Sequence, residues 1–320
     1  MADVVCLGEL LIDFVPTVTG IGLADAETFR KAAGGAPANV AVGLSRLGLS
    51  SAFMGMVGED GFGRFLADTL ARDGVDVALL RFTKRASTPL AFVSLAPDGD
   101  REFLFYRDPG ADSLFAPEDV DEASIAGAKL LHYGSISIIA EPARSATLHA
   151  IGLARAHGVC RSYDPNLREP LWPGREDARA GLLLGLEHAE IVKISEGEVR
   201  FLSGHADAEA GVRALWHDGL ALVTVTCGKH GCRWFTQDES GAVPGFTVAA
   251  VDATGAGDAF MAGLLTGLLE TPDPVLSGAS LDRICRFANA AGAIATTSRG
   301  AIPALPSRAA LDRLLASVPA

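Results

Sequence analysis

The sequence lacks the features that mark secreted, zinc-binding and membrane-spanning chains. Its five cysteines are odd in number and include no Cys-x-x-Cys pair, which disfavours both a disulfide scaffold and a thiolate zinc site. No run reaches the roughly eighteen apolar residues of a membrane helix, and no basic stretch precedes an apolar core at the N-terminus. We therefore expect a cytoplasmic protein that binds no membrane, with reduced and mostly buried thiols: Cys6, Cys160, Cys227, Cys232 and Cys285.

Positive charge is also scarce. The 320 residues include 27 Lys and Arg against 39 Asp and Glu, a formal net charge of −12. This balance disfavours nucleic acid as a partner, so a phosphorylated ligand would need a locally positive site. The apolar share of 49% is that of an ordinary globular protein, and the absence of linkers, repeats and low-complexity tracts indicates a single domain over 1–320.

The sequence does contain a regular alternation of apolar strand-like and helix-like segments. Such alternation predicts a mostly parallel sheet that is covered on both faces. We expect strands over 4–7, 52–57, 130–133, 160–163, 191–194 and 221–226, and helices over 62–72, 143–157, 177–188, 281–297 and 309–316.

Two strands expected over 88–95 and 101–107 interrupt the alternation. The turn residues at 97–100 predict that these strands form a hairpin. The hairpin is either an extension of the sheet edge or a lid over a site, and it carries several aromatic side chains: Phe92, Phe103, Phe105 and Tyr106.

The stretch VDATGAGDAF at 251–260 marks the end of a β-rich segment and the start of a helix. Gly255, Ala256 and Gly257 leave bare backbone amides at a helix N-terminus, an arrangement that suits a phosphoryl oxygen. Asp258 lies in the first turn, where we expect the helix dipole to keep it ionised and able to accept a hydroxyl proton. A Gly-rich turn with a capping Asp is the alternative.

A second glycine motif occupies positions 34–39. Gly34 and Gly35 permit unusual dihedral angles and close approach of a ligand, and Pro37 suits a first helical turn, which places Asn39 near the start of an amphipathic helix. A simple loop is the alternative. Asp13, within an early apolar segment, is either a turn residue or a ligand contact at a strand end.

Polar residues follow two consecutive predicted strands. Arg168 follows the first, and Lys193, Ser195 and Glu198 follow the second. If parallel strands bring these residues to one edge of the sheet, Arg168 and Lys193 supply local positive charge. Glu198 would then help to hold Mg²⁺ through water. Taken singly, each residue is more often a surface ion-pair partner or a helix cap, so the interpretation depends on their joint placement at the strand ends.

Several segments together resemble the ribokinase-like sugar kinases, also called the PfkB family, and within it the fructokinases. DATGAGD at 252–258 is similar to the second family signature, and GGAPAN at 34–39 to part of the first. The similarity to fructokinases lies in segments that span nearly the whole chain: GELLIDFVP at 8–16, REFLFYRDPGAD at 101–112, HYGSIS at 132–137, SYDPNLREPLWP at 162–173 and GAIPALP at 300–306.

The resemblance implies an α/β three-layer sandwich with a mostly parallel sheet and a small β-sheet lid, formed by segments near 10–33 and 86–112. It implies ATP and Mg²⁺ as cofactors, Asp258 as the base, an anion hole at Gly255, Ala256 and Gly257, and Arg168 at the phosphates. Sugar contacts would be Asp13, Gly34, Gly35, Asn39, Phe103 and Arg107. Nucleotide contacts would be Lys193, Ser195, Glu198, Thr226, Gly228, Gly231 and Asn289. A monovalent cation such as K⁺ would lie near Asp252, Thr254, Ala295, Ser298 and Gly300.

Two positions depart from the family pattern. Ala253 stands where the signature often has Thr, and Ser195 where many relatives have the Asn of an N-x-x-E motif. The magnesium network of those relatives is therefore not carried over whole, although Glu198 keeps the acidic position.

We therefore expect an ATP-dependent kinase that phosphorylates fructose, a ketohexose, at its 6-hydroxyl. The same scaffold could instead act on ribose, or on 2-keto-3-deoxygluconate if a lid cation such as Arg107 pairs with the carboxylate. A catalytically idle sugar-binding regulator is the alternative of another class. An exposed lid edge favours a homodimer, because sheet edges are commonly covered by pairing.

Overall fold

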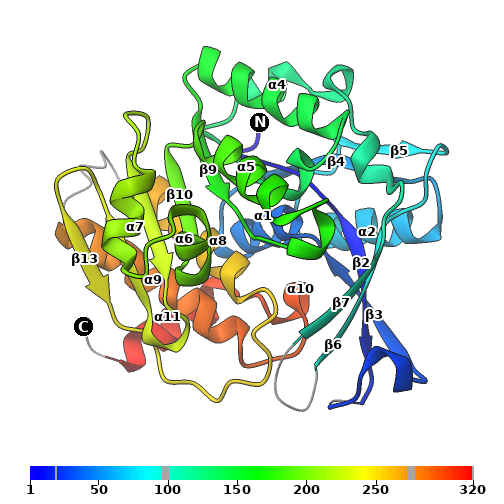
Figure 1. The fold of residues 1–320 in the computed structure, drawn as a ribbon. Helices are drawn as coiled ribbons and strands as arrows, with labels where there is room; N and C mark the ends of the chain where they lie inside the picture. Colours follow the sequence, from blue (N-terminus) through cyan, green and yellow to red (C-terminus); the bar gives the residue numbers. More distant parts are fainter. Residues whose placement is uncertain (19, 96–100, 272–277, 319–320) are drawn as a thin grey trace.

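The computed structural model describes residues 1–18, 20–95, 101–271 and 278–318, with only the backbone of 94, 95 and 101–103. Within these residues the large sheet has nine strands, and Figure 1 shows it running through the middle of the molecule. In chain order they are β1 (Val4–Leu7), β4 (Ser51–Gly58), β5 (Leu80–Thr83), β8 (Leu130–Gly134), β9 (Cys160–Asp164), β10 (Ile191–Ser195), β11 (Leu222–Thr226), β12 (Cys232–Phe235) and β13 (Ser240–Val243).

The large sheet is mostly parallel, as predicted. Its spatial order is β13-β12-β11-β10-β9-β8-β1-β4-β5, and only β12 and β13 pair antiparallel, at one edge. Every residue of β1, β4 and β8 is buried, since strands at the centre of a parallel sheet are covered on both faces.

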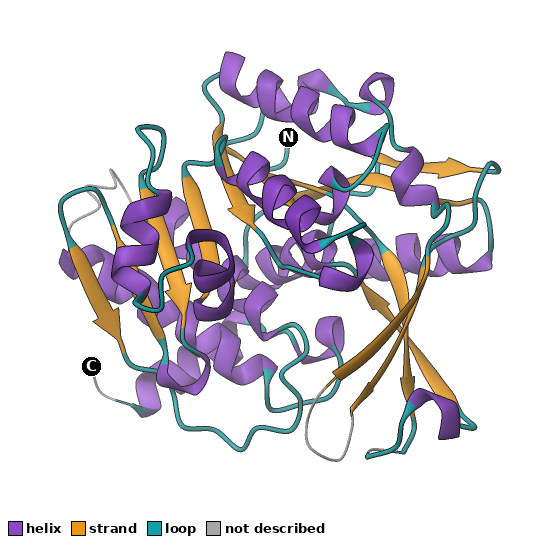
Figure 2. Ribbon diagram, viewed as in Figure 1, coloured by secondary structure: helices purple, strands orange, loops and turns teal. Residues whose placement is uncertain are grey.

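Helices cover both faces of this sheet and complete the predicted three layers (Figure 2). One face packs against α1 (Ala36–Leu47), α2 (Gly61–Arg72), α8 (Ala256–Glu270), α9 (Gly278–Ala295), α10 (Ala301–Ala304) and α11 (Arg308–Ser317). The other face packs against α3 (Glu122–Ala126), α4 (Ala143–Ala156), α5 (Arg175–Leu186), α6 (Glu196–Ser203) and α7 (Ala208–Leu215). No helix in the described part of the chain is both long and apolar enough to span a membrane.

A separate small sheet projects from one side of the molecule. It consists of β2 (Leu11–Pro16), β3 (Phe29–Gly34), β6 (Leu90–Leu95) and β7 (Arg101–Tyr106), in the order β3-β2-β6-β7. β6 and β7 pair antiparallel as the predicted hairpin, and the predicted turn at 97–100 lies outside the described residues. The Phe14 and Phe92 rings stack with centroids 5.0 Å apart, so these aromatics pack within the small sheet.

The segment before the 251–260 motif differs from the prediction. β13 ends at Val243, and residues 244–250 form neither strand nor helix. Pro244 has no amide hydrogen to donate, and the Gly245 amide bonds to the His230 carbonyl instead of a strand partner. The helix that carries Asp258 therefore follows a loop, and the expected β-rich segment ends earlier.

α1 and α8 approach each other so closely that Gly43 is required at their contact. A Cβ added at Gly43 would lie 2.6 Å from the Cβ of Ala262 on α8. Gly152 on α4 offers a contrast, because a Cβ added there would meet nothing within 4 Å.

We expect Gly43→Ala to lower the free energy of unfolding by about 1–3 kcal/mol, because the added methyl group forces the two helices apart. Gly152→Ala is the matched control, and it should raise the free energy of unfolding by about 0.5–1 kcal/mol through helix propensity alone. Urea unfolding midpoints measure both changes. Equal effects of the two substitutions would contradict the close packing of α1 on α8.

Candidate active site

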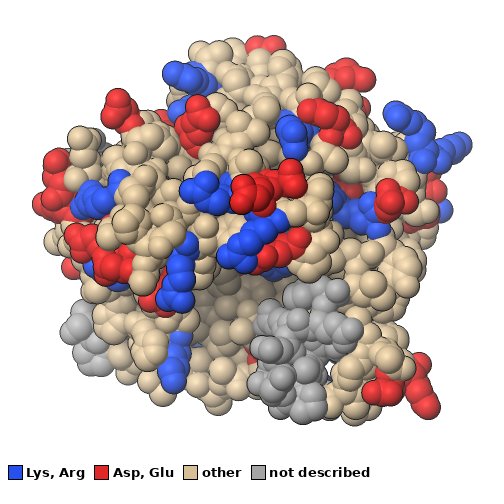
Figure 3. Space-filling view, viewed as in Figure 1, with Lys and Arg blue, Asp and Glu red and all other residues tan. Residues whose placement is uncertain are grey.

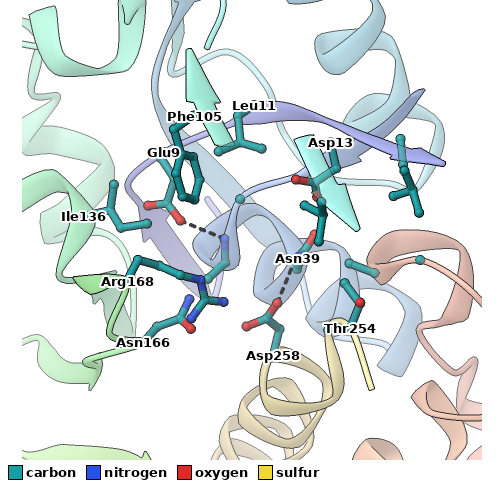
Figure 4. A pocket seen from close by; sticks show the side chains of 18 of the residues that line it. Glu9, Leu11, Asp13, Asn39, Phe105, Ile136, Asn166, Arg168, Thr254 and Asp258 are labelled. Carbon is teal, nitrogen blue, oxygen red and sulfur yellow. Dashed lines mark hydrogen bonds between the residues drawn. The ribbon is translucent and has the colours of Figure 1, made fainter. Parts of the chain in front are cut away.

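A pocket lies where the small sheet meets the large one (Figure 4). Its walls come from the small sheet, from the first turns of α1, α8 and α10, and from the loops after β1, β8 and β9 and before α8. The polar side chains that line it are those of Glu9, Asp13, Asn39, Asn166, Arg168, Asp252, Thr254 and Asp258. Leu11, Val15, Val93, Phe105 and Ile136 supply apolar wall.

Gly34 and Gly35 shape the wall at the start of α1. A Cβ at Gly34 would lie 2.1 Å from Asp13 Oδ2, and a Cβ at Gly35 would lie 2.4 Å from the Glu9 carbonyl oxygen. Gly35 also has a φ of 110°, which disfavours residues with a side chain. Because no side chain intervenes, the Ala36 amide donates a hydrogen bond of 2.8 Å to Glu9 Oε1.

Asn39 and Asp258 connect the first turns of α1 and α8. Asn39 Nδ2 donates to Asp258 Oδ2 at 2.7 Å, and both side chains are buried. Within the described part of the chain, Asn39 Oδ1 has no hydrogen-bond partner although it is buried in a side chain that lines the pocket. A buried acceptor of this kind is suited to a ligand hydroxyl.

The pKa of Asp258 is shifted in the direction opposite to the one that the helix dipole alone would give. Burial raises its pKa, and this effect exceeds the opposing effects of the Asn39 hydrogen bond and of the nearby Lys193 and Arg168 charges. The helix dipole favours the charged form, but the loss of water around the buried carboxyl group has the larger effect on the pKa. A raised pKa strengthens Asp258 as a proton acceptor.

Two other carboxyl groups of the pocket are perturbed in the same direction. Burial raises the pKa of Glu9 to about 7. It also raises the pKa of Asp13 to about 7, against the lowering effect of Arg168. Figure 3 shows acidic and basic side chains interspersed over one face of the molecule, so the positive charge of Arg168 in the pocket is a local feature.

The predicted anion hole is only partly available. Gly255 precedes α8 with a φ of 76°, as a tight turn into the helix requires. The Ala256 amide already donates to the Ala253 carbonyl oxygen at 3.2 Å. Gly255 and Gly257 therefore remain as first-turn amides of the kind that bind anions.

Lys193 lies directly beneath this turn. A Cβ added at Gly257 would be 3.0 Å from Lys193 Nζ, so glycine leaves room for the lysine. Lys193 is buried, and its Nζ is 2.7 Å from Asp164 Oδ2. The sequence analysis did not predict this ion pair. Its charge is thus largely balanced within the protein.

A second, more open pocket adjoins the first. Lys193, Ser195, Glu198, Thr226 and Gly257 line it. Arg168 and Asn166 line both pockets. The two pockets therefore meet at Arg168 and at the first turn of α8, which contributes Gly255 and Asp258 to one and Gly257 to the other.

Ser195 and Glu198 form a capping box at the start of α6. The Ser195 hydroxyl donates to Glu198 Oε2 at 2.7 Å, and the Ser195 amide bonds to the same oxygen at 2.8 Å. Glu198 Oε1 accepts the Leu167 amide at 2.7 Å. Both carboxylate oxygens are therefore engaged, and Glu198 would contact a metal ion through its remaining lone pairs or through water.

The other predicted nucleotide residues lie around the end of β11. Thr226 ends this strand, and Gly228 starts a short 3-10 turn with a φ of 56° and open space where a Cβ would be. A Cβ at Gly231 would lie 2.1 Å from the Val243 carbonyl oxygen. Asn289 Nδ2 donates to that same oxygen at 3.1 Å, so Gly231 and Asn289 position the loop after β13.

Asp252 ties the loop before α8 to the loop before α10. Its Oδ1 accepts the Thr254 amide and hydroxyl at 2.9 and 2.7 Å, and its Oδ2 accepts the Gly300 amide at 2.9 Å. Of the other two residues predicted at the cation site, Ala295 is buried and Ser298 is exposed. The described residues contain no group of three or more His, Cys, Asp or Glu that could hold a metal ion, so a cation here would depend on carbonyl oxygens.

One predicted sugar residue, Arg107, does not line the pocket. Arg107 Nη2 and Nε contact Asp112 Oδ2 at 2.6 and 2.8 Å. The side chain of Phe103 lies outside the described residues, and Phe105 lines the pocket. The sequence analysis missed Glu9, whose only local signal is an acid between two apolar segments, and Asn166, which it quoted in a motif without assigning it a role.

All five cysteines are free, and Cys6, Cys232 and Cys285 are buried. Cys160 and Cys227 are partly buried. This distribution matches the expectation of mostly buried thiols.

Comparison with known proteins identifies relatives along the whole chain. Residues 1–308 match the model of the pfkB family carbohydrate kinases. The chain is 52% identical over 317 residues to "Probable fructokinase-7" of Arabidopsis thaliana, covering 98% of this chain and 92% of the relative. The structure of fructokinase with bound ATP from Xylella fastidiosa has a TM-score of 0.90 at 37% identity, covering 99% of each chain. Fructokinase from Vibrio cholerae O395 in its form with fructose, ADP and calcium has a TM-score of 0.89 at 37% identity, covering 98% of this chain and 99% of the other.

The buried Lys193–Asp164 pair generates a prediction on stability. Lys193→Met should lower the free energy of unfolding by about 3–5 kcal/mol near neutral pH, because it leaves the Asp164 charge buried and unpaired. The double variant Lys193→Met/Asp164→Leu should recover most of this loss. Urea unfolding measures both, with Lys129→Met at the exposed Lys129–Asp3 pair as the control, expected to cost at most about 1 kcal/mol.

The deficit of Lys193→Met should shrink as the pH falls. With Lys193 present, burial already raises the pKa of Asp164 to about 6, and removing the cation raises it further. In the variant, folded Asp164 keeps its proton to a pH above 6, whereas unfolded Asp164 loses it near pH 4. The free energy of unfolding of the variant therefore falls as the pH rises between these two pKa values. A deficit that is constant between pH 5 and pH 8 would contradict the role of the Asp164 charge.

Proposed function

The chain belongs to the pfkB family of carbohydrate kinases, and we propose that it transfers the terminal phosphoryl group of ATP to the 6-hydroxyl of fructose. One observation carries the proposal: Arg168 and the first turn of α8 line both a pocket that is rich in acceptors for hydroxyl groups and a second, more open pocket. Fructokinases with this fold bind ATP, or fructose and ADP, which supports a sugar in the first pocket and a nucleotide in the second.

The first pocket suits a polyol. Asp13 and the unpartnered Asn39 Oδ1 accept hydrogen bonds from sugar hydroxyls, and Gly34 and Gly35 let the sugar approach the backbone. Phe105 packs against an apolar face of the sugar ring. The apolar side chains of the wall limit the access of water to the reacting hydroxyl.

Asp258 acts as the base. Its carboxylate accepts the proton of the attacking hydroxyl, and Asn39 holds it in position through the 2.7 Å bond to Oδ2. The raised pKa of Asp258 brings its proton affinity closer to that required near neutral pH. The other oxygen, Oδ1, is left to face the substrate.

The transferred group is stabilised by fixed positive charge and dipoles. Arg168 contacts the phosphoryl oxygens from the junction of the two pockets, and the Gly255 and Gly257 amides point at them from the helix N-terminus. Lys193 adds a weaker contribution, because Asp164 balances its charge. Positioning and charge stabilisation supply most of the rate in phosphoryl transfer.

The residues around the second pocket fit a nucleotide with a metal ion. Thr226, Gly228 and the loop that Gly231 and Asn289 hold would contact the nucleotide. Mg²⁺, when bound, neutralises charge on the phosphates. Ser195 and Glu198 would meet it through water, since their direct bonds close the capping box.

A monovalent cation, K⁺, would bind at the loops that Asp252 ties together. Thr254, Ala295, Ser298 and Gly300 would supply carbonyl oxygens, and the Asp252 charge would balance the ion. Ala253 does not weaken this assignment, because a site of carbonyl oxygens does not use its side chain.

The alternative substrates receive less support. A 2-keto-3-deoxygluconate kinase would pair the substrate carboxylate with Arg107, yet Arg107 already forms two contacts with Asp112. A catalytically idle sugar sensor would have no use for a buried base beside a glycine turn at the second pocket. Ribose remains the principal competitor, since it offers the same hydroxyl chemistry.

A homodimer and a cytoplasmic location remain predictions of the sequence. The dimer is supported by β7, an edge strand of the small sheet on which Leu104 is 46% and Tyr106 59% exposed.

A panel of sugars tests the substrate. We expect kcat/KM for fructose, measured by coupled ADP release, to exceed that for ribose and for 2-keto-3-deoxygluconate by at least about 10-fold, because a site that pairs with substrate hydroxyls rejects analogues that leave those groups unpaired. If ribose or 2-keto-3-deoxygluconate turns over faster than fructose, that sugar is the substrate and the assignment of fructose is wrong. The absence of ADP release with every sugar would support the idle sensor.

Asp258→Asn tests the base. We expect kcat to fall roughly 10²- to 10⁴-fold, while the Kd for fructose measured by calorimetry changes only a few-fold, because Asn keeps the shape of the side chain and loses the proton acceptor. Asp207→Asn is the matched control, since Asp207 is an exposed Asp at the N-terminus of α7 that caps the Ala210 amide. Near-normal turnover of Asp258→Asn would remove Asp258 from the chemistry.

A further inference from the structure

Glu9 occupies an unusual place in the chain. It lies between β1 of the large sheet and β2 of the small sheet, and it is only 2% exposed. Its Oε1 accepts the Ala36 amide at 2.8 Å, which ties the entry into the small sheet to the return from β3 into α1. Figure 4 shows its carboxylate among the pocket side chains, with this bond drawn.

The second oxygen of Glu9 has no hydrogen-bond partner among the residues that the structure describes. Glu9 Oε2 is buried, although it belongs to a side chain that lines the pocket. Leaving a buried carboxylate oxygen unpaired is costly, so a hydrogen-bond donor is expected there when the site is in use. Arg107 interacts with Glu9 electrostatically, but its guanidinium makes its close contacts with Asp112.

We propose that Glu9 determines sugar specificity: its Oε2 accepts a hydrogen bond from a sugar hydroxyl other than the one phosphorylated, while Oε1 holds the Gly34–Gly35–Ala36 turn. The assignment rests on the proposed sugar kinase function. The hydroxyl differs from the reacting one because that group must lie beside Asp258, whose Oδ2 is bound to Asn39. Figure 4 shows the Glu9 and Asp258 carboxylates reaching the pocket from separate elements.

Glu9→Gln and Glu9→Ala separate the two oxygens. Gln keeps an acceptor for the Ala36 amide and replaces Oε2 by an NH₂ group, whereas Ala removes both. We expect Glu9→Gln to raise KM for fructose about 10-fold, with kcat and the KM for ATP within about 2-fold of wild type, because binding to the hydroxyl is equal in the ground and transition states. Glu118→Gln, an exposed Glu outside both pockets, is the matched control and should change neither.

A cycle with monodeoxy sugars gives a readout that a purely structural role would not move. In wild type, kcat/KM for the 1-, 3- and 4-deoxy derivatives of fructose should each fall relative to fructose, by about 10- to 100-fold where a charged partner is lost. In Glu9→Ala the ratio should approach 1 for one derivative and stay unchanged for the others. In Glu9→Gln the same derivative should show an intermediate ratio.

The outcomes distinguish this assignment from the proposed function. If another sugar turns over better than fructose, the cycle is run with its monodeoxy derivatives, and the choice of fructose fails independently of Glu9. If every derivative keeps its wild-type ratio in folded Glu9→Gln, Glu9 only anchors the turn and the specificity role is overturned. If no sugar is phosphorylated, the kinase function and the assignment of Glu9 fall together.

Discussion

The hydrogen bond from Asn39 Nδ2 to Asp258 Oδ2 is the constraint on which the site depends. It joins residues 219 positions apart and holds the first turns of α1 and α8 against one another. One turn further along α1, the two helices pack so closely that a Cβ at Gly43 would lie 2.6 Å from the Cβ of Ala262. Close packing of two helices thereby places the buried acceptor of Asn39 beside the glycine turn at the start of α8.

The same arrangement buries several ionisable groups, which lowers the stability of the fold. Glu9 and Asp13 have raised pKa values of about 7, and that of Asp258 is raised as well, since each loses water. The positive charges of Arg168 and Lys193 offset part of the cost of burying these carboxyl groups. Extensive apolar packing on both faces of the large sheet keeps the fold stable in spite of this cost. The free energy lost at the site is small compared with the free energy gained by burying the apolar surface.

The site also lies where the chain passes between its two sheets. Glu9 leads into the small sheet, Gly35 leads out of it, and Arg107 follows its last strand. The Glu9–Ala36 bond and the Arg107–Asp112 pair fasten these crossings. Asp13 lies on β2 of the small sheet, and Asp258 lies on α8, which packs on the large sheet. The distance between the two carboxylates is therefore set by how the two sheets meet.

The sequence by itself determined the alternation of strands and helices, the glycine turn before Asp258 and the placement of Asn39 in the first turn of a helix. These features depend on backbone dihedral angles and on side chains a few positions apart, which a single segment encodes. Only the tertiary structure decided that the Ala256 amide is already bonded, that Arg107 and Lys193 are balanced by Asp112 and Asp164, that Asp258 has a raised pKa and that Glu9 lines the pocket. Pairing and burial arise from contacts between distant segments, and desolvation of a charge cannot be read from its neighbours in sequence.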